Sequence, residues 1–244
     1  LSPLLSNIVL DELDRELERR GHRFVRYADD CNVYVRTQRA GERVMASLRH
    51  FIERRLRLKV NETKSAVARP EERHFVGFRL RREPLDGHVE VLLSKRSKER
   101  IDQRIRELVP RNWGGSLDAC ISRLNAYLVG WVGFFGICTE EAAKVFQTLD
   151  AHIRRRLRAL QLRHWKRKRT VLRNLVSRGI RRSTAWRTVY GGRKSTWALS
   201  HSPAVDLALR NSHWDARGLI SVGHRWRQMH TPIVAPTQLV LGLG

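Results

Sequence analysis

The sequence predicts an α+β fold: a region of helices and antiparallel hairpins, then an all-helical bundle and a small basic C-terminal part. Two observations carry most of this prediction. In residues 1–93, short runs rich in Val, Phe and Tyr alternate with apolar residues at helical spacing, whereas after Ser94 only the helical spacing continues. Beyond residue 170 the patterns shorten, and Arg residues cluster between glycines.

The N-terminal region opens with an apolar stripe at helical spacing that ends at Gly21, a residue suited to closing a helix. The stripe consists of Leu4, Leu5, Ile8, Val9, Leu13 and Leu17. The elements predicted in this region are a helix at 4–20, two strands within 24–35, a helix at 41–56, an extended segment at 57–68, and a hairpin of 74–81 and 88–93 around Asp86-Gly87.

The following region is predicted to be helical throughout, and helical patterns cover 95–108, 116–135 and 139–165. Pro110 and Gly114-Gly115 separate the first two of these helices. Beyond residue 170 we expect small elements and, from Ile233, a flexible apolar tail. Four tryptophans there either form a small core or offer stacking platforms for bases, and core is the favoured role for most of them: Trp186, Trp197, Trp214 and Trp226.

Two adjacent carboxylates, Asp29 and Asp30, lie between the first two predicted strands. A hairpin tip would hold both acids where a divalent cation gathers oxygen ligands. Mg²⁺ takes carboxylate oxygens together with water and substrate phosphates, and such ions stabilise phosphoryl transfer. The pair therefore predicts nucleotidyl transfer. The alternative is an ordinary Asx turn with solvated carboxylates.

The charge of the chain indicates a polyanionic partner. The 48 Lys and Arg residues exceed the 24 Asp and Glu residues, which gives a net charge of +24. The excess is concentrated towards the C-terminus, and residues 151–200 contain no Asp or Glu. A solvated helix face normally mixes both signs, so this stretch predicts nucleic-acid binding. Its candidate RNA-binding residues are Arg154, Arg155, Arg156, Arg158, Lys166, Arg167, Lys168 and Arg169.

Other classes of protein fit the sequence poorly. Cys31, Cys120 and Cys138 are too widely spaced for a zinc motif or a disulfide framework. The sequence has no apolar run of membrane-spanning length and opens with no signal peptide. We expect a cytoplasmic, nucleic-acid-associated protein of bacterial type that has no membrane partner. The chain begins with Leu1 and not with Met, which suggests a fragment.

The order of the motifs resembles that of the group II intron reverse transcriptase/maturase family, a class of intron-encoded proteins. Residues 24–35 resemble the catalytic Tyr-Ala-Asp-Asp hairpin of that family, and residues 1–14 resemble the helix after its Pro-Gln-Gly turn. The other matching segments are 56–65, Phe75-Val-Gly-Phe, Leu124-Asn125, Gly130-Trp131, Phe134-Phe135 and Trp165-Lys-Arg-Lys-Arg.

This resemblance implies part of a polymerase palm at 1–93, a helical thumb and maturase-specific domain at 94–170, and a basic nucleic-acid-binding appendage at 171–244. It implies that Asp29 and Asp30 are catalytic metal ligands, for Mg²⁺ in the complete enzyme. The residues that it places near the primer or the incoming nucleotide are Tyr27, Ala28, Asn61, Lys64 and Gly77. Lys64 would neutralise triphosphate charge or act as a general acid, and a plain surface lysine is an equal alternative.

One departure from the family matters for activity. The family carries a further catalytic Asp before the Pro-Gln-Gly turn, and this sequence starts after that turn. We therefore expect a C-terminal fragment that does not polymerise DNA alone, whereas its parent would be an RNA-directed DNA polymerase that also promotes splicing.

The expected partners are group II intron RNA and, in the complete enzyme, a DNA primer or target and dNTP. A homodimer stays open. Two other functions stay open as well: an RNA-binding splicing factor without polymerase activity, and an architectural basic protein whose phosphate contacts carry no sequence preference.

Overall fold

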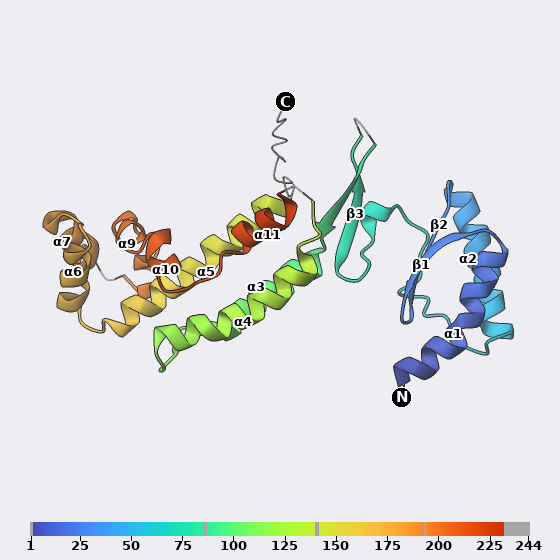
Figure 1. Cartoon of the computed structure of the whole chain (residues 1–244), viewed down its shortest axis with the longest axis horizontal. Helices are drawn as coiled ribbons and strands as arrows, with labels where there is room; N and C mark the ends of the chain where they lie inside the picture. The colour runs from blue at the N-terminus through green and yellow to red at the C-terminus, as the bar shows by residue number, and fades with distance from the viewer. Residues whose placement is uncertain (1, 85–86, 140–141, 193, 232–244) are drawn as a thin grey trace, which may run out of the picture. The chain divides into compact units, whose positions relative to one another are not determined.

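A computed structural model describes residues 2–84, 87–139, 142–192 and 194–231, and confirms the α+β prediction (Figure 1). The chain forms two compact units, whose boundary lies between Ser94 and Lys95. The tail from Ile233 and the turn residue Asp86, both subjects of sequence predictions, lie outside the described residues.

The described residues of the first unit form two antiparallel hairpins and two long helices. The β1–β2 hairpin follows α1, and the β3–β4 hairpin ends the unit. Thr37 caps α2, because its side-chain oxygen accepts a hydrogen bond from the Ala40 N–H at 3.2 Å. The elements are α1 (Ser2–Arg19), β1 (Arg23–Tyr27), β2 (Asp30–Tyr34), α2 (Gln38–Arg54), the 3-10 turn η1 (Pro70–Glu72), β3 (Phe78–Arg82) and β4 (Val89–Leu93).

The core of the first unit lies between α1, α2 and one face of the β1–β2 hairpin. Leu10, Leu13 and Leu17 are its buried residues, and burial of each leucine contributes about 1.5–3 kcal/mol. The side chains that pack against them are Phe24, Cys31, Val33, Leu48, Phe51, Ile52 and Leu56. The predicted apolar stripe of α1 is thus only partly buried: Leu4, Leu5, Ile8 and Val9 are exposed.

The second hairpin begins later than the sequence suggests. Residues 74–77 were predicted to lie in a strand, but Phe75 and Phe78 exchange backbone hydrogen bonds of 2.9 Å across a tight turn. Both central residues of this turn have positive φ, 50° at Val76 and 85° at Gly77. That is the backbone of a type I′ turn, which glycine adopts freely and a β-branched residue rarely adopts. The Phe-Val-Gly-Phe segment therefore reverses the chain before β3.

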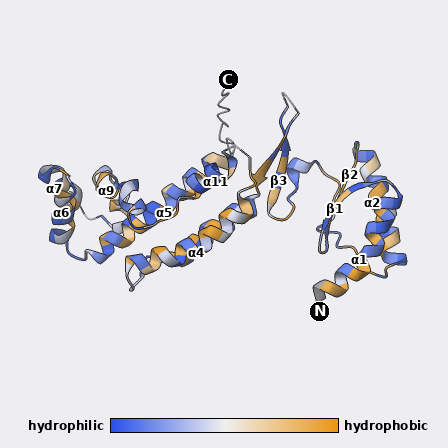
Figure 2. Cartoon of the chain, viewed as in Figure 1, coloured by the Kyte–Doolittle hydropathy of each residue, from blue (hydrophilic) through white to orange (hydrophobic). Residues whose placement is uncertain are grey.

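In the residues that the structure describes, the second unit contains helices and no strand, and α4 is the most apolar of its long helices (Figure 2). Helix α3 has the predicted bounds, and Ser116 caps α4 by accepting the Ala119 N–H at 3.1 Å. The described helices of this unit are α3 (Lys95–Leu108), α4 (Leu117–Phe135), α5 (Ala142–His164), α6 (Lys168–Ser177), α7 (Arg182–Tyr190), α8 (Thr196–Leu199), α9 (Pro203–Ala208), α10 (Asn211–Asp215) and α11 (Val222–His230).

Helix α5 is the centre of this unit, because α4, α8 and α11 all contact it. Residues 156–162 are buried on every side of the helix. A helix that is surrounded by protein normally needs apolar residues on all faces, so any charge there must find a partner inside the protein.

Helix α11 returns from the C-terminal part and joins the bundle. The Trp226 ring is buried, lies 5.7 Å from the Phe146 ring, and donates its indole N–H to the Cys138 carbonyl at 2.8 Å. The Asp150 carboxylate accepts hydrogen bonds from the Ser221 hydroxyl and from two backbone N–H groups at the start of α11. The segment that the sequence presents as a basic appendage thus supplies core residues to the second unit.

Candidate catalytic hairpin and nucleic-acid interface

The β1–β2 hairpin has one buried face and one exposed face. Strand pairing runs from Arg23 opposite Tyr34 to Tyr27 opposite Asp30, and leaves a two-residue loop. Phe24 and Val33 pack against α1. Side chains alternate between the two faces of a strand, and Tyr27 and Asp30 each lie three residues from one of these two, so both point to the opposite face. Tyr27 is 64% exposed. The hairpin therefore presents the aromatic ring and the Asp30 carboxylate side by side to solvent.

The loop of this hairpin consists of Ala28 and Asp29. Ala28 has φ of +53°, a backbone conformation that costs a residue with a Cβ about 1–2 kcal/mol. Strain of this kind gathers at functional sites, where surrounding contacts hold it. Asp29 and Asp30 are both exposed, and within the described residues neither carboxylate pairs with a cationic side chain. Two adjacent, uncompensated negative charges favour the approach of a cation.

Arg26 holds this loop in place. Its guanidinium donates to the Asp14 carboxylate at 2.6–3.0 Å, to the Asn7 side-chain oxygen at 2.8 Å, and to the Ala28 carbonyl at 2.7 Å. The Asp14 carboxylate raises the pKa of Arg26. One side chain of β1 thus joins two turns of α1 to the loop that precedes Asp29. The charge of Arg26 is thus neutralised by Asp14, and no cationic side chain of the described residues pairs with Asp29 or Asp30.

In the complete enzyme that the family resemblance implies, we expect Arg26→Lys to reduce primer extension by about 10- to 100-fold, as is typical when a group that positions a metal ligand is removed. An ammonium cannot reproduce the fork that reaches Asp14 and Ala28 together. Steady-state primer extension, with circular dichroism to check the fold, measures the effect. Arg23→Lys on the exposed face of the same strand is the control. Equal activity of the two variants would contradict a positioning role for Arg26.

The other residues that the sequence assigns to the substrate lie elsewhere in the first unit. Asn61 forms an Asx turn: its side-chain oxygen accepts from the Lys64 N–H at 3.1 Å and from the Thr63 hydroxyl at 2.8 Å. This turn leaves the Lys64 side chain exposed. The Gly77 carbonyl accepts from the Ser94 N–H at 3.0 Å. In the described residues, no hydrogen bond or ion pair joins Asn61 or Lys64 to Asp29 or Asp30.

The donor set at the hairpin suits Mg²⁺ better than a transition metal. The two exposed carboxylates offer only oxygen atoms as ligands. Mg²⁺ is commonly bound by one or two carboxylates together with water and substrate phosphates. Among the described residues no group of three or more His, Cys, Asp or Glu side chains gathers into a larger cluster. The chemistry of Asp29 and Asp30 thus fits an ion of this kind.

Two of the arginines assigned to RNA are occupied inside the protein. Arg156 and Arg158 are only 8% and 7% exposed, and burial lowers the pKa of both guanidinium groups. Arg156 donates to the Val109 carbonyl at the end of α3, whereas Arg158 donates to the Ser200 carbonyl and pairs with Asp206. The all-round burial of α5 explains the difference from the sequence prediction, and we exclude both residues from the RNA surface.

The remaining candidates differ in exposure. Arg154 and Arg155 are half-buried, and the Arg155 guanidinium lies 4.1 Å from the centre of the Trp197 ring. Residues 166–169, between α5 and the first turn of α6, are all exposed. This run is therefore the part of the predicted RNA surface that is best placed to reach phosphates.

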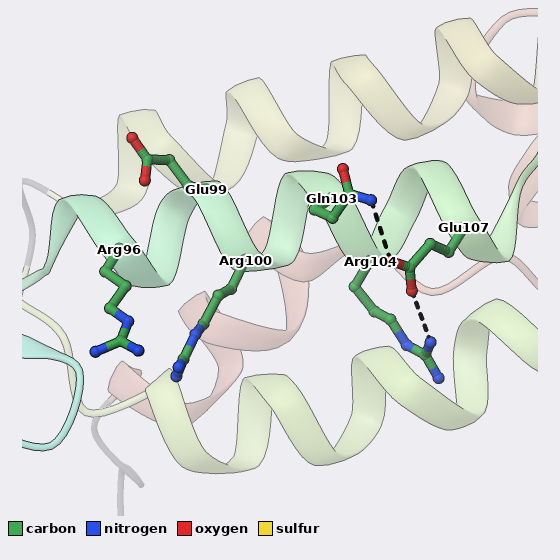
Figure 3. A pocket seen from close by; sticks show the side chains of 6 residues that line it. All are labelled: Arg96, Glu99, Arg100, Gln103, Arg104 and Glu107. Carbon is green, nitrogen blue, oxygen red and sulfur yellow. Dashed lines mark hydrogen bonds and ion pairs between the residues drawn. The ribbon is translucent and has the colours of Figure 1, made fainter.

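A further basic row on α3 escaped the sequence prediction. Arg96, Arg100 and Arg104 line an open groove and extend from the same side of the helix (Figure 3). Spacing of four residues puts side chains on one face, so the signal was present in the sequence as Arg-x-x-x-Arg-x-x-x-Arg. Arg104 also donates to the Glu107 carboxylate at 2.8 Å, one turn further along α3. A row of this kind suits a phosphate backbone.

We expect Arg167→Gln/Arg169→Gln to lower the slope of log affinity against log salt by about 0.7–0.9 for each phosphate that is no longer neutralised. Arg158→Met should leave that slope unchanged and reduce the free energy of unfolding by about 1–3 kcal/mol, because it leaves a buried carbonyl unpaired. RNA binding at several salt concentrations and urea unfolding measure the two effects. A salt slope that falls for Arg158→Met but not for Arg167→Gln/Arg169→Gln would contradict our assignment of the RNA-binding residues.

The comparisons with known proteins agree with this division of the chain. The model of the reverse transcriptase (RNA-dependent DNA polymerase) family matches residues 1–80, and that of the group II intron maturase-specific domain matches residues 98–178. No curated protein matches the sequence. No helix in the described part of the chain combines the length and apolarity that crossing a membrane requires. Because a reverse transcriptase segment precedes a maturase-specific domain in one polypeptide, the chain belongs to the group II intron-encoded reverse transcriptase/maturase family.

Proposed function

We propose that this chain supplies the carboxylate hairpin and the RNA-binding bundle of an RNA-directed DNA polymerase that copies intron RNA and promotes its splicing. The observation that carries the proposal is the exposed pair Asp29 and Asp30, which pairs with no cationic side chain of the described residues and lies on a loop that Arg26 ties to α1. The match of residues 1–80 to the reverse transcriptase family supports the same function.

The reaction would join a DNA primer to an incoming dNTP. The 3′-oxygen of the primer forms a bond to the α-phosphorus, the bond from that phosphorus to the oxygen bridging to the β-phosphate breaks, and pyrophosphate leaves while the hydroxyl proton passes to solvent. Bound Mg²⁺ would supply charge stabilisation at the attacking and leaving oxygens. Asp29 and Asp30 would hold the ion, and Tyr27, on the same exposed face of the hairpin as Asp30, would offer a ring against the primer end.

The second unit would bind the intron RNA. Its exposed basic run at 166–169 and the row of Arg96, Arg100 and Arg104 offer charges to phosphates on two helices. The sequence around the run contains no acidic residue between positions 151 and 200. Phosphate contacts of this kind provide affinity and orientation, while RNA shape provides selectivity.

Primer extension by the protein as expressed from its own gene tests the polymerase proposal. We expect extension on an intron RNA template to require Mg²⁺ and the Asp29 carboxylate. Extension that continues undiminished in Asp29→Ala would exclude the hairpin as the metal site.

A splicing factor without polymerase activity is the second candidate, and the match of residues 98–178 to the maturase-specific domain favours it. It predicts that the protein promotes splicing but does not extend a primer under any metal condition. Splicing that survives Asp29→Ala while extension disappears would instead show that one protein carries both activities.

A further inference from the structure

Helix α7 carries two stacked aromatic rings, of which Trp186 is exposed and Tyr190 is half-buried. Trp186 is 56% exposed, and its ring stacks on that of Tyr190 with centroids 5.6 Å apart and planes inclined by 27°. The other tryptophans in this part of the chain have different surroundings. Trp214 and Trp226 are buried, and Trp197 is half-buried beneath the guanidinium groups of Arg111 and Arg155. Only Trp186 among these four leaves most of its surface accessible.

The packing of α7 explains why the Trp186 ring faces solvent. Ala185 and Val189, four residues apart, are the buried residues of α7, and the helix packs against α6 and α9. Trp186 and Tyr190 each follow one of these positions, so they form a second row beside the buried one. The two rings stack on each other before any ligand arrives, which lowers the entropic cost of binding a flat group.

One cation lies close to the Tyr190 ring, and two more are exposed on the same helix as the rings. The Lys168 ammonium lies 5.3 Å from the centre of the Tyr190 ring, and Arg182 and Arg187 are exposed on the same helix as Trp186. In the described part of the chain, neither of these arginines pairs with a carboxylate. Ser183 and Thr184, also exposed, complete a polar setting. An apolar protein partner would be poorly matched to such surroundings, whereas a polyanion that carries flat rings suits them.

We propose that Trp186 and Tyr190 form a stacking platform for an unpaired nucleobase of a single-stranded nucleic acid, while Lys168, Arg182 and Arg187 neutralise its phosphates. Bases stack on aromatic side chains irrespective of sequence, and cations that follow the backbone add affinity. The platform lies beyond residue 178, where the match to the maturase-specific domain ends. It therefore adds a contact to the proposed RNA-binding bundle and does not depend on polymerase activity.

Binding of the full chain to short strands with and without bases tests the platform. Fluorescence anisotropy would compare an ordinary single-stranded oligonucleotide with an abasic strand of equal length and charge, for the unsubstituted chain and Trp186→Ala. We expect the substitution to weaken binding of the ordinary strand by roughly 5- to 140-fold and to leave binding of the abasic strand unchanged. Trp186→Phe should restore most of the affinity, because it keeps a ring that can stack.

Arg187→Gln is the matched control on the next residue of the same helix. It should weaken both strands equally and lower the salt slope, because it removes charge and not a stacking surface. Parallel series with RNA and DNA strands show which sugar the platform accepts.

The proposal fails if Trp186→Ala binds the ordinary strand as tightly as the unsubstituted chain does, or loses affinity equally for both strands. Because Trp186 is exposed, we expect its variants to fold, and circular dichroism checks this. The assay measures binding alone, so its failure would leave the polymerase proposal standing, and loss of primer extension in Asp29→Ala would leave this one untouched.

Discussion

Primer extension by the complete enzyme should fall by more than about 100-fold when Asp29 and Asp30 are both replaced by Asn, because the amides remove the two negative charges that would hold Mg²⁺. Both side chains are exposed and make no contact with a cationic side chain in the described residues, so the change should leave the fold intact. Intron RNA binding should also be unchanged, because its proposed residues lie in the second unit.

Asp11→Asn provides the control for this double variant. Asp11 is also an exposed carboxylate of the first unit, but it pairs with Arg15 one helical turn away. We expect Asp11→Asn to retain nearly full activity. A loss of extension that is equal in the two variants, or a loss that accompanies weakened RNA binding, would show that general charge and not the hairpin carboxylates is responsible.

Asp150→Ala should have the largest effect on stability, a reduction of about 3 kcal/mol or more in the free energy of unfolding. The buried carboxylate accepts from the Ser221 hydroxyl at 2.6 Å, the Val222 N–H at 2.8 Å and the Gly223 N–H at 3.0 Å. Without it, two buried backbone donors at the start of α11 have no acceptor. We expect α11 to detach and to expose Trp226, which urea unfolding and tryptophan fluorescence would detect.

Asp118→Ala is the matched control for Asp150→Ala. Asp118 also joins a helix of the bundle to the C-terminal segment, through an ion pair of 2.9 Å with Arg217, but its side chain is 74% exposed. Solvent screens such a pair, so the substitution should change stability by less than about 1 kcal/mol. If both variants unfold at the same urea concentration, the buried carboxylate does not dock α11.

Local sequence patterns predicted the elements of this fold well. The bounds of α3 follow from apolar residues at helical spacing, and the β1–β2 hairpin follows from two β-prone runs around Asp29 and Asp30. Each of these signals is contained within a short stretch of the chain. The Phe-Val-Gly-Phe turn escaped prediction because Val76 has the positive φ that its side chain disfavours.

Burial was harder to predict than secondary structure. Arg156 cannot be told apart by sequence from the less buried arginines beside it. Only the packing of other helices around α5 shows that its guanidinium donates to the Val109 carbonyl at the end of α3. The docking of α11 depends on Asp150, which is 71 residues from Ser221 along the chain. No local pattern connects residues that are so far apart.

The candidate site was predicted in part. The carboxylate pair was visible in the sequence because both acids are adjacent and flanked by strands. The role of Arg26 was not visible in the sequence. It depends on one guanidinium donating hydrogen bonds both to Asn7 and Asp14 of α1 and to Ala28 of the hairpin loop. Supporting interactions of this kind are fixed by tertiary packing and appear only in the structure.

Metal-directed cleavage tests the central claim, that the Asp29-Asp30 hairpin binds the catalytic ion, most directly. Fe²⁺ would replace Mg²⁺ in the complex of the complete enzyme with primer, template and dNTP, and ascorbate with peroxide would then generate radicals that cut the chain beside the bound metal. We predict cuts around residues 27–31 that excess Mg²⁺ suppresses and that the Asp29→Asn/Asp30→Asn variant lacks. Cleavage that spares this hairpin, or that is identical in the variant, would contradict the account.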